Sequence, residues 1–293
     1  MRIRPLEVGT ALTAFFDLQA TDSAFRHTCH PQMSEIGWNA YLSFLERKKL
    51  APFEPRENNG RAHVSFVAGP VGFNCDLAVW FAMSCFEEES PPTDSEMYVW
   101  KQLMRCFAIG HAMEEELYQW VTPALEIYYA PRGIEITRMD FEWPIFRDKP
   151  HLAGDKELLA GTADVRFEYV EKGNLRVGVV DFKSTSVGRA DKRSRTTGIE
   201  AEAEYVRQVS TYLEPIEADW GALVYWIKQW DHGFQQAEVE RRPGYYQKTI
   251  RRLDGIYGDV AVARPSPATP GSHCRKCPFR GACQEVTDMH VGA

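Results

Sequence analysis

The sequence predicts an α/β fold, in which a central mixed sheet is flanked by helices and a cysteine-bound segment follows near the C-terminus. Segments with helical and strand-like patterns occur in the order helix, strands, helix, strand, which is typical of an α/β core. The 293 residues are 44% hydrophobic and 12% aromatic, enough to build a sizeable core. Three of the seven cysteines lie close together near the end of the chain.

The elements follow from the spacing of apolar residues. Helical spacing predicts helices over residues 35–49, 96–129 and 199–213, and another that ends near residue 257. Strand-like alternation and β-branched or aromatic residues predict strands over residues 134–143, 161–170, 175–183 and 220–230. Residues 171–174 separate the second and third strands with a turn sequence, so these two strands are expected to form a β-hairpin.

Three regions are expected along the chain. An acidic, proline-containing loop over residues 87–94 separates a helical or irregular N-terminal region, residues 1–95, from a core over residues 96–260. The stretch 264–271 contains three prolines and predicts a stiff linker into a C-terminal cysteine segment, residues 261–293.

The formal charge of −7 argues against a protein that binds nucleic acid over its whole surface, so any DNA contact must be local. No run of about 18 apolar residues is present, which argues against a membrane span. The N-terminus also lacks a convincing signal peptide, and a cytoplasmic location is expected. In a reducing compartment, clustered cysteines favour metal ligation over disulfides.

The hairpin brings two carboxylates together. If the turn is centred between Lys172 and Gly173, residues opposite one another have numbers that sum to the same value, and Asp164 and Asp181 satisfy that sum. Lys183 lies two residues beyond Asp181, on the same face of the strand. Opposed like charges repel unless a cation sits between them, so this trio predicts a Mg²⁺ or Mn²⁺ site. Alternatively, both aspartates are solvated on an exposed sheet face.

Four motifs occur in an order that resembles the PD-(D/E)XK nuclease superfamily, and within it the RecB-like exonuclease branch. Gly161-Thr-Ala-Asp164 resembles the Gly-x-x-Asp motif, and Asp181-Phe-Lys183 resembles the (D/E)-x-K motif. Gly110-His111, followed by two glutamates, resembles the upstream motif in which a histidine reaches the metal. Gln208-Val-Ser-Thr-Tyr212 resembles the Gln-x-x-x-Tyr motif. The resemblance covers roughly residues 100–285 and implies a restriction-endonuclease-like core.

The resemblance also implies roles for these residues. His111, Asp164, Asp181 and the backbone carbonyl of Phe182 would hold Mg²⁺ or Mn²⁺, while Lys183 assists the attack on the phosphate. Gln208 and Tyr212 would contact DNA or position the lysine. Each residue also has a plainer interpretation, because a single histidine or a polar helix face often has no chemical task.

The C-terminal cysteines Cys274, Cys277 and Cys283 have the spacing C-x2-C-x5-C, which lets a short loop present several thiolates to one metal centre. This triplet resembles the iron-sulfur staple of AddB-type helicase-nucleases and CRISPR-associated exonucleases, which implies a [4Fe-4S] cluster with a fourth cysteine upstream. Cys29 is the candidate preferred for that position, ahead of the other upstream cysteines: Cys75, Cys85 and Cys106. A zinc site of three cysteines and one histidine, His273 or His30, remains the alternative.

A basic loop shortly after Lys183 is the candidate DNA-binding segment. Its four cations are Arg189, Lys192, Arg193 and Arg195, which would hold a strand through its phosphates unless the loop is simply solvated.

The sequence therefore predicts a DNA exonuclease that acts on single strands or duplex ends in recombination, repair, phage replication or CRISPR adaptation. A helicase, recombinase or integrase is a possible protein partner. The alternative is a non-cutting DNA-binding or scaffold subunit of such a complex.

Overall fold

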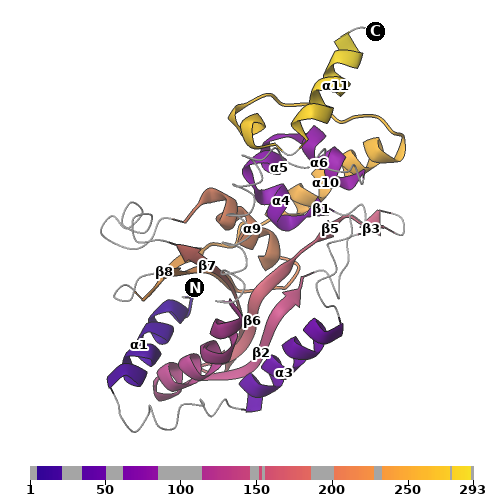
Figure 1. Ribbon diagram of the computed structural model, residues 1–293. Helices are drawn as coiled ribbons and strands as arrows, with labels where there is room; N and C mark the ends of the chain where they lie inside the picture. Colours follow the sequence, from indigo (N-terminus) through magenta and orange to yellow (C-terminus); the bar gives the residue numbers. More distant parts are fainter. Residues whose placement is uncertain are drawn as a thin grey trace.

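A five-stranded mixed sheet forms the centre of the computed structural model (Figure 1). Its strand order is β2-β6-β7-β8-β9, with bounds Ile134–Pro144, Thr162–Glu171, Asn174–Thr185, Trp220–Ile227 and Phe234–Val239. Within this sheet only the neighbours β7 and β8 are parallel, and α9, Ala203–Leu213, lies in the crossover between them. The structure describes residues 5–21, 35–50, 62–84, 114–145, 152–153, 156–185, 201–227, 233–277 and 279–291.

The hairpin of β6 and β7 has the predicted register. Val165 pairs with Val180 and Glu171 with Asn174, so opposed residue numbers keep the expected constant sum. Lys172 and Gly173 both have positive φ, 51° and 76°, as a tight two-residue hairpin turn requires. The turn therefore determines which residues meet at the far end of the hairpin.

Helices cover both faces of the sheet. One face packs against α1, Val8–Thr21, against α3, Glu35–Leu50, and against the helical residues 114–129. The other face packs against α9, α4, α6 and α10. The bounds on this second side are α4 Val64–Ala68, α5 Pro70–Asn74, α6 Asp76–Met83 and α10 Tyr245–Ala261. Figure 1 shows the two groups of helices on opposite sides of the sheet.

Smaller elements complete the description. The strand β1, Ala62–His63, pairs in parallel with β5, Leu159–Ala160, and β3, Leu152–Ala153, pairs antiparallel with β4, Lys156–Glu157. Three further helical segments are η1 Ala130–Arg132, η2 Ser272–Lys276 and α11 Arg280–Val291. The helix α11 carries the last of the clustered cysteines.

Most predicted elements are confirmed, with shifts at their ends. The helix expected over residues 35–49 is α3. Of the strand expected over 220–230, residues 220–227 form β8 and residues 228–230 lie outside the described residues. The helix expected from residue 199 begins at Ala203, after extended backbone at Glu202. Of the helix expected over 96–129, residues 114–129 are helical and the earlier part lies outside the described residues.

Residues 62–84, which carried no strong pattern, form three short helices. Gly69 and Pro70 end α4 and start α5, and extended backbone at Cys75 separates α5 from α6. Residues 62–84 belong to the N-terminal region expected over residues 1–95. They pack directly on the sheet through Val64, Val67 and Val79. In the part of the chain that the structure describes, no helix is both long and apolar enough to span a bilayer.

Candidate active site

Asp164 and Asp181 lie at the end of the hairpin farthest from its turn. The last paired residues before them are Val165 and Val180. Beyond that pair, the backbone N–H of Phe182 donates a hydrogen bond of 2.6 Å to Oδ2 of Asp164. The aspartate side chain thus takes up a backbone donor at the end of the ladder and remains close to Asp181.

Lys183 points to the same site. Its ammonium forms an ion pair with Oδ2 of Asp181, whose side chain is only 1% exposed. The ammonium also lies 5.1 Å from the ring centroid of Tyr205 on α9. Burial by itself lowers the pKa of Lys183, but the charges of Asp181 and Asp164 outweigh burial and raise that pKa above its ordinary value. The lysine is therefore cationic at neutral pH.

The carboxylates carry more negative charge than Lys183 neutralises. Burial raises the pKa of Asp164 well above its ordinary value, and the charge of Asp181 raises it further. Lys183 and the N–H of Phe182 act in the opposite direction, while Glu114 adds to the increase. A divalent cation held by carboxylate oxygens would remove this imbalance.

Gln208 and Tyr212 lie on one face of α9, as their spacing predicted, and this face turns toward the hairpin. The side-chain amide of Gln208 donates to the phenol oxygen of Tyr212 at 2.8 Å and lies 3.4 Å from Oδ1 of Asp181. Burial, followed by the charge of Asp181, raises the pKa of the fully buried Tyr212. These two residues therefore bear on the orientation of Asp181.

A glycine lets α9 come this close to the sheet. A Cβ atom added at Gly221 of β8 would lie 2.7 Å from Val209 and 2.8 Å from Leu213, both on α9. Such contacts are too short for carbon atoms, so a larger residue would push the helix away from the sheet. Gly221 thereby contributes to placing Gln208 beside Asp181.

Two further acids act on the same site and were not among the predicted site residues. The phenol of Tyr118 is buried and its ring stacks on Phe141 with centroids 4.8 Å apart. Burial and then the charges of Asp164, Glu142, Glu114 and Asp181, in that order, raise the pKa of Tyr118. Glu142 has a positive φ of 45° within β2, and the pairs Phe141–Val165 and Trp143–Ala163 on either side of it place it opposite Asp164. Both positions are visible in the sequence, Glu114 shortly after His111 and Glu142 on the strand before the hairpin, where the RecB-like branch often has an acidic residue.

Comparison with known proteins decides the family. The sequence profile described as the PD-(D/E)XK nuclease superfamily matches residues 86–284. The chain belongs to this superfamily. No curated protein sequence matches the chain.

Three solved structures resemble this superfamily member. The structure titled SSO0001 is 16% identical over 84% of this chain and 94% of that chain, with a TM-score of 0.40. An alkaline exonuclease, LHK-Exo from Laribacter hongkongensis, is 13% identical over 70% of this chain and 90% of that chain, with a TM-score of 0.39. Its complex with dAMP gives 14% identity over the same shares and a TM-score of 0.42.

Several predicted site residues of this PD-(D/E)XK protein fall outside the described residues. They are the predicted metal ligand His111, the tentative cluster ligand Cys29 and the basic loop residues Arg189, Lys192, Arg193 and Arg195. Their assignments stay predictions.

The C-terminal cysteines have an unexpected neighbour. Cys277 and Cys283 pack against a small apolar cluster that contains Cys75, Phe81 and Phe279. These two cysteines, Cys75 and Cys274 all have free thiols. Among the described residues, no group of three or more His, Cys, Asp or Glu side chains is already arranged to hold a metal ion.

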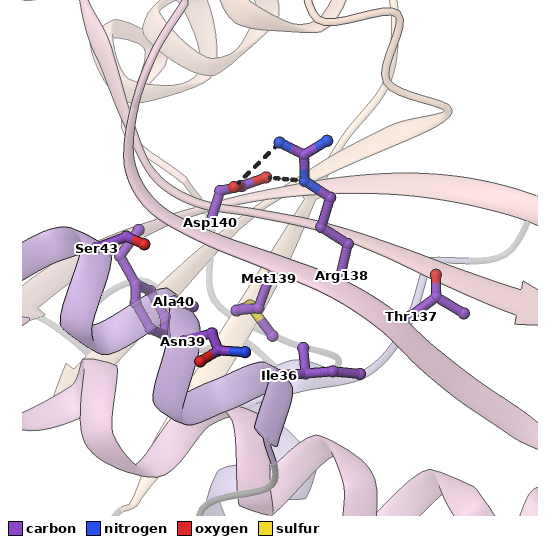
Figure 2. A pocket seen from close by; sticks show the side chains of 9 residues that line it. Ile36, Asn39, Ala40, Ser43, Thr137, Arg138, Met139 and Asp140 are labelled. Carbon is purple, nitrogen blue, oxygen red and sulfur yellow. Dashed lines mark hydrogen bonds and ion pairs between the residues drawn. The ribbon is translucent and has the colours of Figure 1, made fainter.

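A separate hollow of about 290 Å³ lies between α3 and β2 (Figure 2). Arg138 and Asp140 line it and are paired with each other, at 2.9 Å between Nε and Oδ2. Asp140 also pairs with Arg166 of the neighbouring strand at 3.1 Å. None of the candidate catalytic residues lines this hollow, so it is distinct from the candidate active site.

Proposed function

We propose that this protein is a metal-dependent deoxyribonuclease that hydrolyses phosphodiester bonds and acts as an exonuclease on single strands or duplex ends. Its membership of the nuclease superfamily supports the reaction class. The observation that carries the proposal is the meeting of Asp164, Asp181 and Lys183 at one end of the hairpin, with Gln208 directed at Asp181.

Asp164 and Asp181, with His111 and the backbone carbonyl of Phe182, would hold Mg²⁺ or Mn²⁺. The donor chemistry fits, because hard divalent cations prefer carboxylate and carbonyl oxygens. The surplus negative charge that raises the pKa of Asp164 also favours a cation. When bound, such an ion supplies positive charge to a scissile phosphate and makes a water molecule more acidic.

The side chains around the carboxylates have separate tasks in this proposal. Lys183 stays protonated and supplies a positive charge that can stabilise the charge developing on the phosphate. Gln208 orients the carboxylate of Asp181, and Tyr212 holds the side-chain amide of Gln208 in place by accepting its hydrogen bond. The basic loop of Arg189, Lys192, Arg193 and Arg195 would hold the strand through its phosphates.

The C-terminal triplet Cys274, Cys277 and Cys283 is proposed to bind a [4Fe-4S] cluster of the RecB-like branch, with zinc as the alternative. Its spacing and its free thiols support metal ligation. Such a centre would be structural, because it lies in the apolar cluster around Phe279 and not among the acidic residues of the hairpin. The work of the enzyme would fall in recombination, repair, phage replication or CRISPR adaptation, alongside a helicase, recombinase or integrase.

The test compares wild-type protein with Asp181→Asn on end-labelled single-stranded and double-stranded DNA, with Mg²⁺, Mn²⁺ or EDTA. Asp259→Asn is the matched control, because Asp259 pairs with Arg264 and Ser266 far along the chain from the site. Cleavage that needs metal and disappears only in Asp181→Asn supports the proposal. Release of mononucleotides would indicate exonuclease action, whereas internal fragments would indicate an endonuclease. Binding without cleavage by folded, metal-supplied protein would instead favour a non-cutting subunit.

A further inference from the structure

The C-terminal cysteines lie on a tight turn and on the helix that follows it: Cys274 is in η2, Cys277 ends η2, and Cys283 is in the first turn of α11. The backbone N–H of Cys277 donates to the carbonyl of Cys274 at 3.3 Å, and that of Cys283 donates to Phe279 at 2.9 Å. The N–H of Gly271 lies 3.4 Å from the sulfur of Cys274. This stretch folds back on itself, so that three thiols from ten residues of sequence lie in one small region.

Cys75 reaches the same region from a distant part of the chain. It lies in extended backbone between α5 and α6, and its side chain is 7% exposed. Aromatic rings hold the two segments together: Phe279 stacks on Phe81 with centroids 5.4 Å apart and meets the ring of Phe66 edge-on at 6.2 Å. The cysteine is thus buried at the contact between the α4–α6 layer and the C-terminal segment.

Packing places the thiols near one another. Cys277 and Cys283 pack against the apolar cluster that contains Cys75. Cys274 lies three residues before Cys277, and the backbone hydrogen bond between these two residues closes the turn that carries both.

We propose that Cys75 is the fourth thiolate of the cysteine-bound centre, together with Cys274, Cys277 and Cys283. The inference rests on the proposed metal centre at the triplet and names the ligand that completes it. A single buried cysteine ordinarily behaves as a small apolar side chain. Cys277 and Cys283 pack against the same apolar cluster and change that expectation, because soft sulfur donors suit an iron-sulfur cluster or zinc. The described side chains are not arranged around an ion, so binding would draw the four thiolates together.

Two other residues compete for the fourth position. Cys29, preferred from the sequence, lies outside the described residues. His273 is next to Cys274, and its buried Nε2 has no hydrogen-bond partner. Its ring folds against Gly271, however, and it is not part of the apolar cluster that joins Cys75, Cys277 and Cys283. The geometry therefore favours Cys75 over His273.

A centre bound through Cys75 would connect the C-terminal segment to the active-site helix. Arg252 of α10 donates to Asp76 at 2.7 Å and to the carbonyl of Gly72 at 2.6 Å, on either side of Cys75. Arg207 donates to the carbonyl of Ala68 at 2.8 Å and is the residue before Gln208 on α9. Loss of the centre would therefore loosen the layer that supports Gln208, which predicts lower stability together with weaker cleavage.

The experiment measures metal content and not DNA cleavage. Full-length wild-type protein, Cys75→Ser, Cys29→Ser, His273→Ala and Cys277→Ser are purified without oxygen. Iron, acid-labile sulfide and zinc are determined for each, with the visible absorption spectrum. We expect about four irons and four sulfides per wild-type chain, and loss of most of both in Cys75→Ser and Cys277→Ser. Cys29→Ser and His273→Ala should retain the wild-type content.

Each outcome separates the possibilities. Zinc in place of iron, lost in Cys75→Ser, still supports the ligand assignment. Metal that is retained in Cys75→Ser but lost in Cys29→Ser or His273→Ala would overturn it, and a wild-type chain without metal after anaerobic reconstitution would remove the centre altogether. If Cys75→Ser does not fold, thiol alkylation of the wild-type holoprotein replaces it: Cys75 must be protected with the triplet and become reactive once metal is removed. Asp181→Asn should keep the wild-type content of iron, sulfide or zinc. Failure of the nuclease proposal can therefore be distinguished from failure of the ligand assignment.

Discussion

Replacing Asp164 with asparagine should distinguish two effects of this carboxylate: the destabilisation that its buried charge causes without metal, and the stabilisation that it provides by binding metal. Asparagine keeps an oxygen that can accept the 2.6 Å hydrogen bond from the N–H of Phe182 but carries no charge. The change leaves Asp181 and Lys183 as a one-to-one ion pair. Without metal, we therefore expect the variant to be at least as stable as the wild-type protein.

The size of the effect follows from the charges. Two unit charges about 5 Å apart interact by about 3 kcal/mol at an effective dielectric constant of about 20. The relieved repulsion with Asp181 and the lost attraction to Lys183 are of this order and largely cancel. Burial is the first cause of the raised pKa of Asp164, so the remaining gain is desolvation that a neutral amide largely avoids, about 1–3 kcal/mol. With metal at about 100 times its Kd, the wild-type protein should gain about 2.7 kcal/mol and the variant nothing.

Urea unfolding followed by tryptophan fluorescence measures both quantities: the free energy of unfolding in EDTA, and its increase when Mn²⁺ is added. The expected result is that the wild-type protein is the less stable in EDTA and gains stability with Mn²⁺, while Asp164→Asn does not respond. Asp259→Asn, at a distant ion pair, should respond to Mn²⁺ as the wild-type protein does. A variant that is clearly less stable in EDTA and responds normally to Mn²⁺ would refute the placement of Asp164 at the metal.

Three other changes test the surroundings of the site. Lys183→Met should abolish cleavage and leave a buried carboxylate unpaired, lowering the free energy of unfolding by about 3–5 kcal/mol in denaturant titrations. Tyr212→Phe removes the oxygen that accepts from Gln208 at 2.8 Å; we expect a loss of about 1 kcal/mol in stability and a fall in kcat with little change in KM, measured by steady-state cleavage. Gly178→Ala would place Cβ 2.6 Å from the indole of Trp220, so overpacking should cost about 1–3 kcal/mol and lower Tm in calorimetry, while a retained Tm would show that the core relaxes.

The hairpin and its acids could be predicted because local sequence determines them. The turn at Lys172 and Gly173 fixes the register by its backbone geometry, and the period of two along a strand then places Asp181 and Lys183 on one face. That Gln208 and Tyr212 share one face of α9 followed in the same way from their helical spacing, whereas the direction of that face did not. In each case the residues are close in sequence, so local backbone geometry is enough to determine their relative positions in the fold.

The fourth cysteine could not be predicted in this way. Cys75 lies between two five-to-eight-residue helices whose boundaries depend on Gly69 and Pro70, and no periodic pattern indicated which way the chain would turn there. Its nearness to Cys277 depends on the packing of Phe81 on Phe279, between segments far apart in sequence. Among several upstream cysteines, only tertiary structure could distinguish it.

Glu114 and Glu142 illustrate a second limit. Glu142 lies opposite Asp164, because Phe141 pairs with Val165 and Trp143 with Ala163. That pairing depends on a register shift between Ile136 and Arg138, which strand periodicity does not indicate. Both acids raise the pKa of the buried phenol of Tyr118 together with Asp164 and Asp181. Two buried carboxylates beside one ammonium, Asp164 and Asp181 beside Lys183, are costly for folding alone. This arrangement becomes favourable when a divalent cation is present, which is why stability in the presence and absence of metal is the most direct measure of what this site is for.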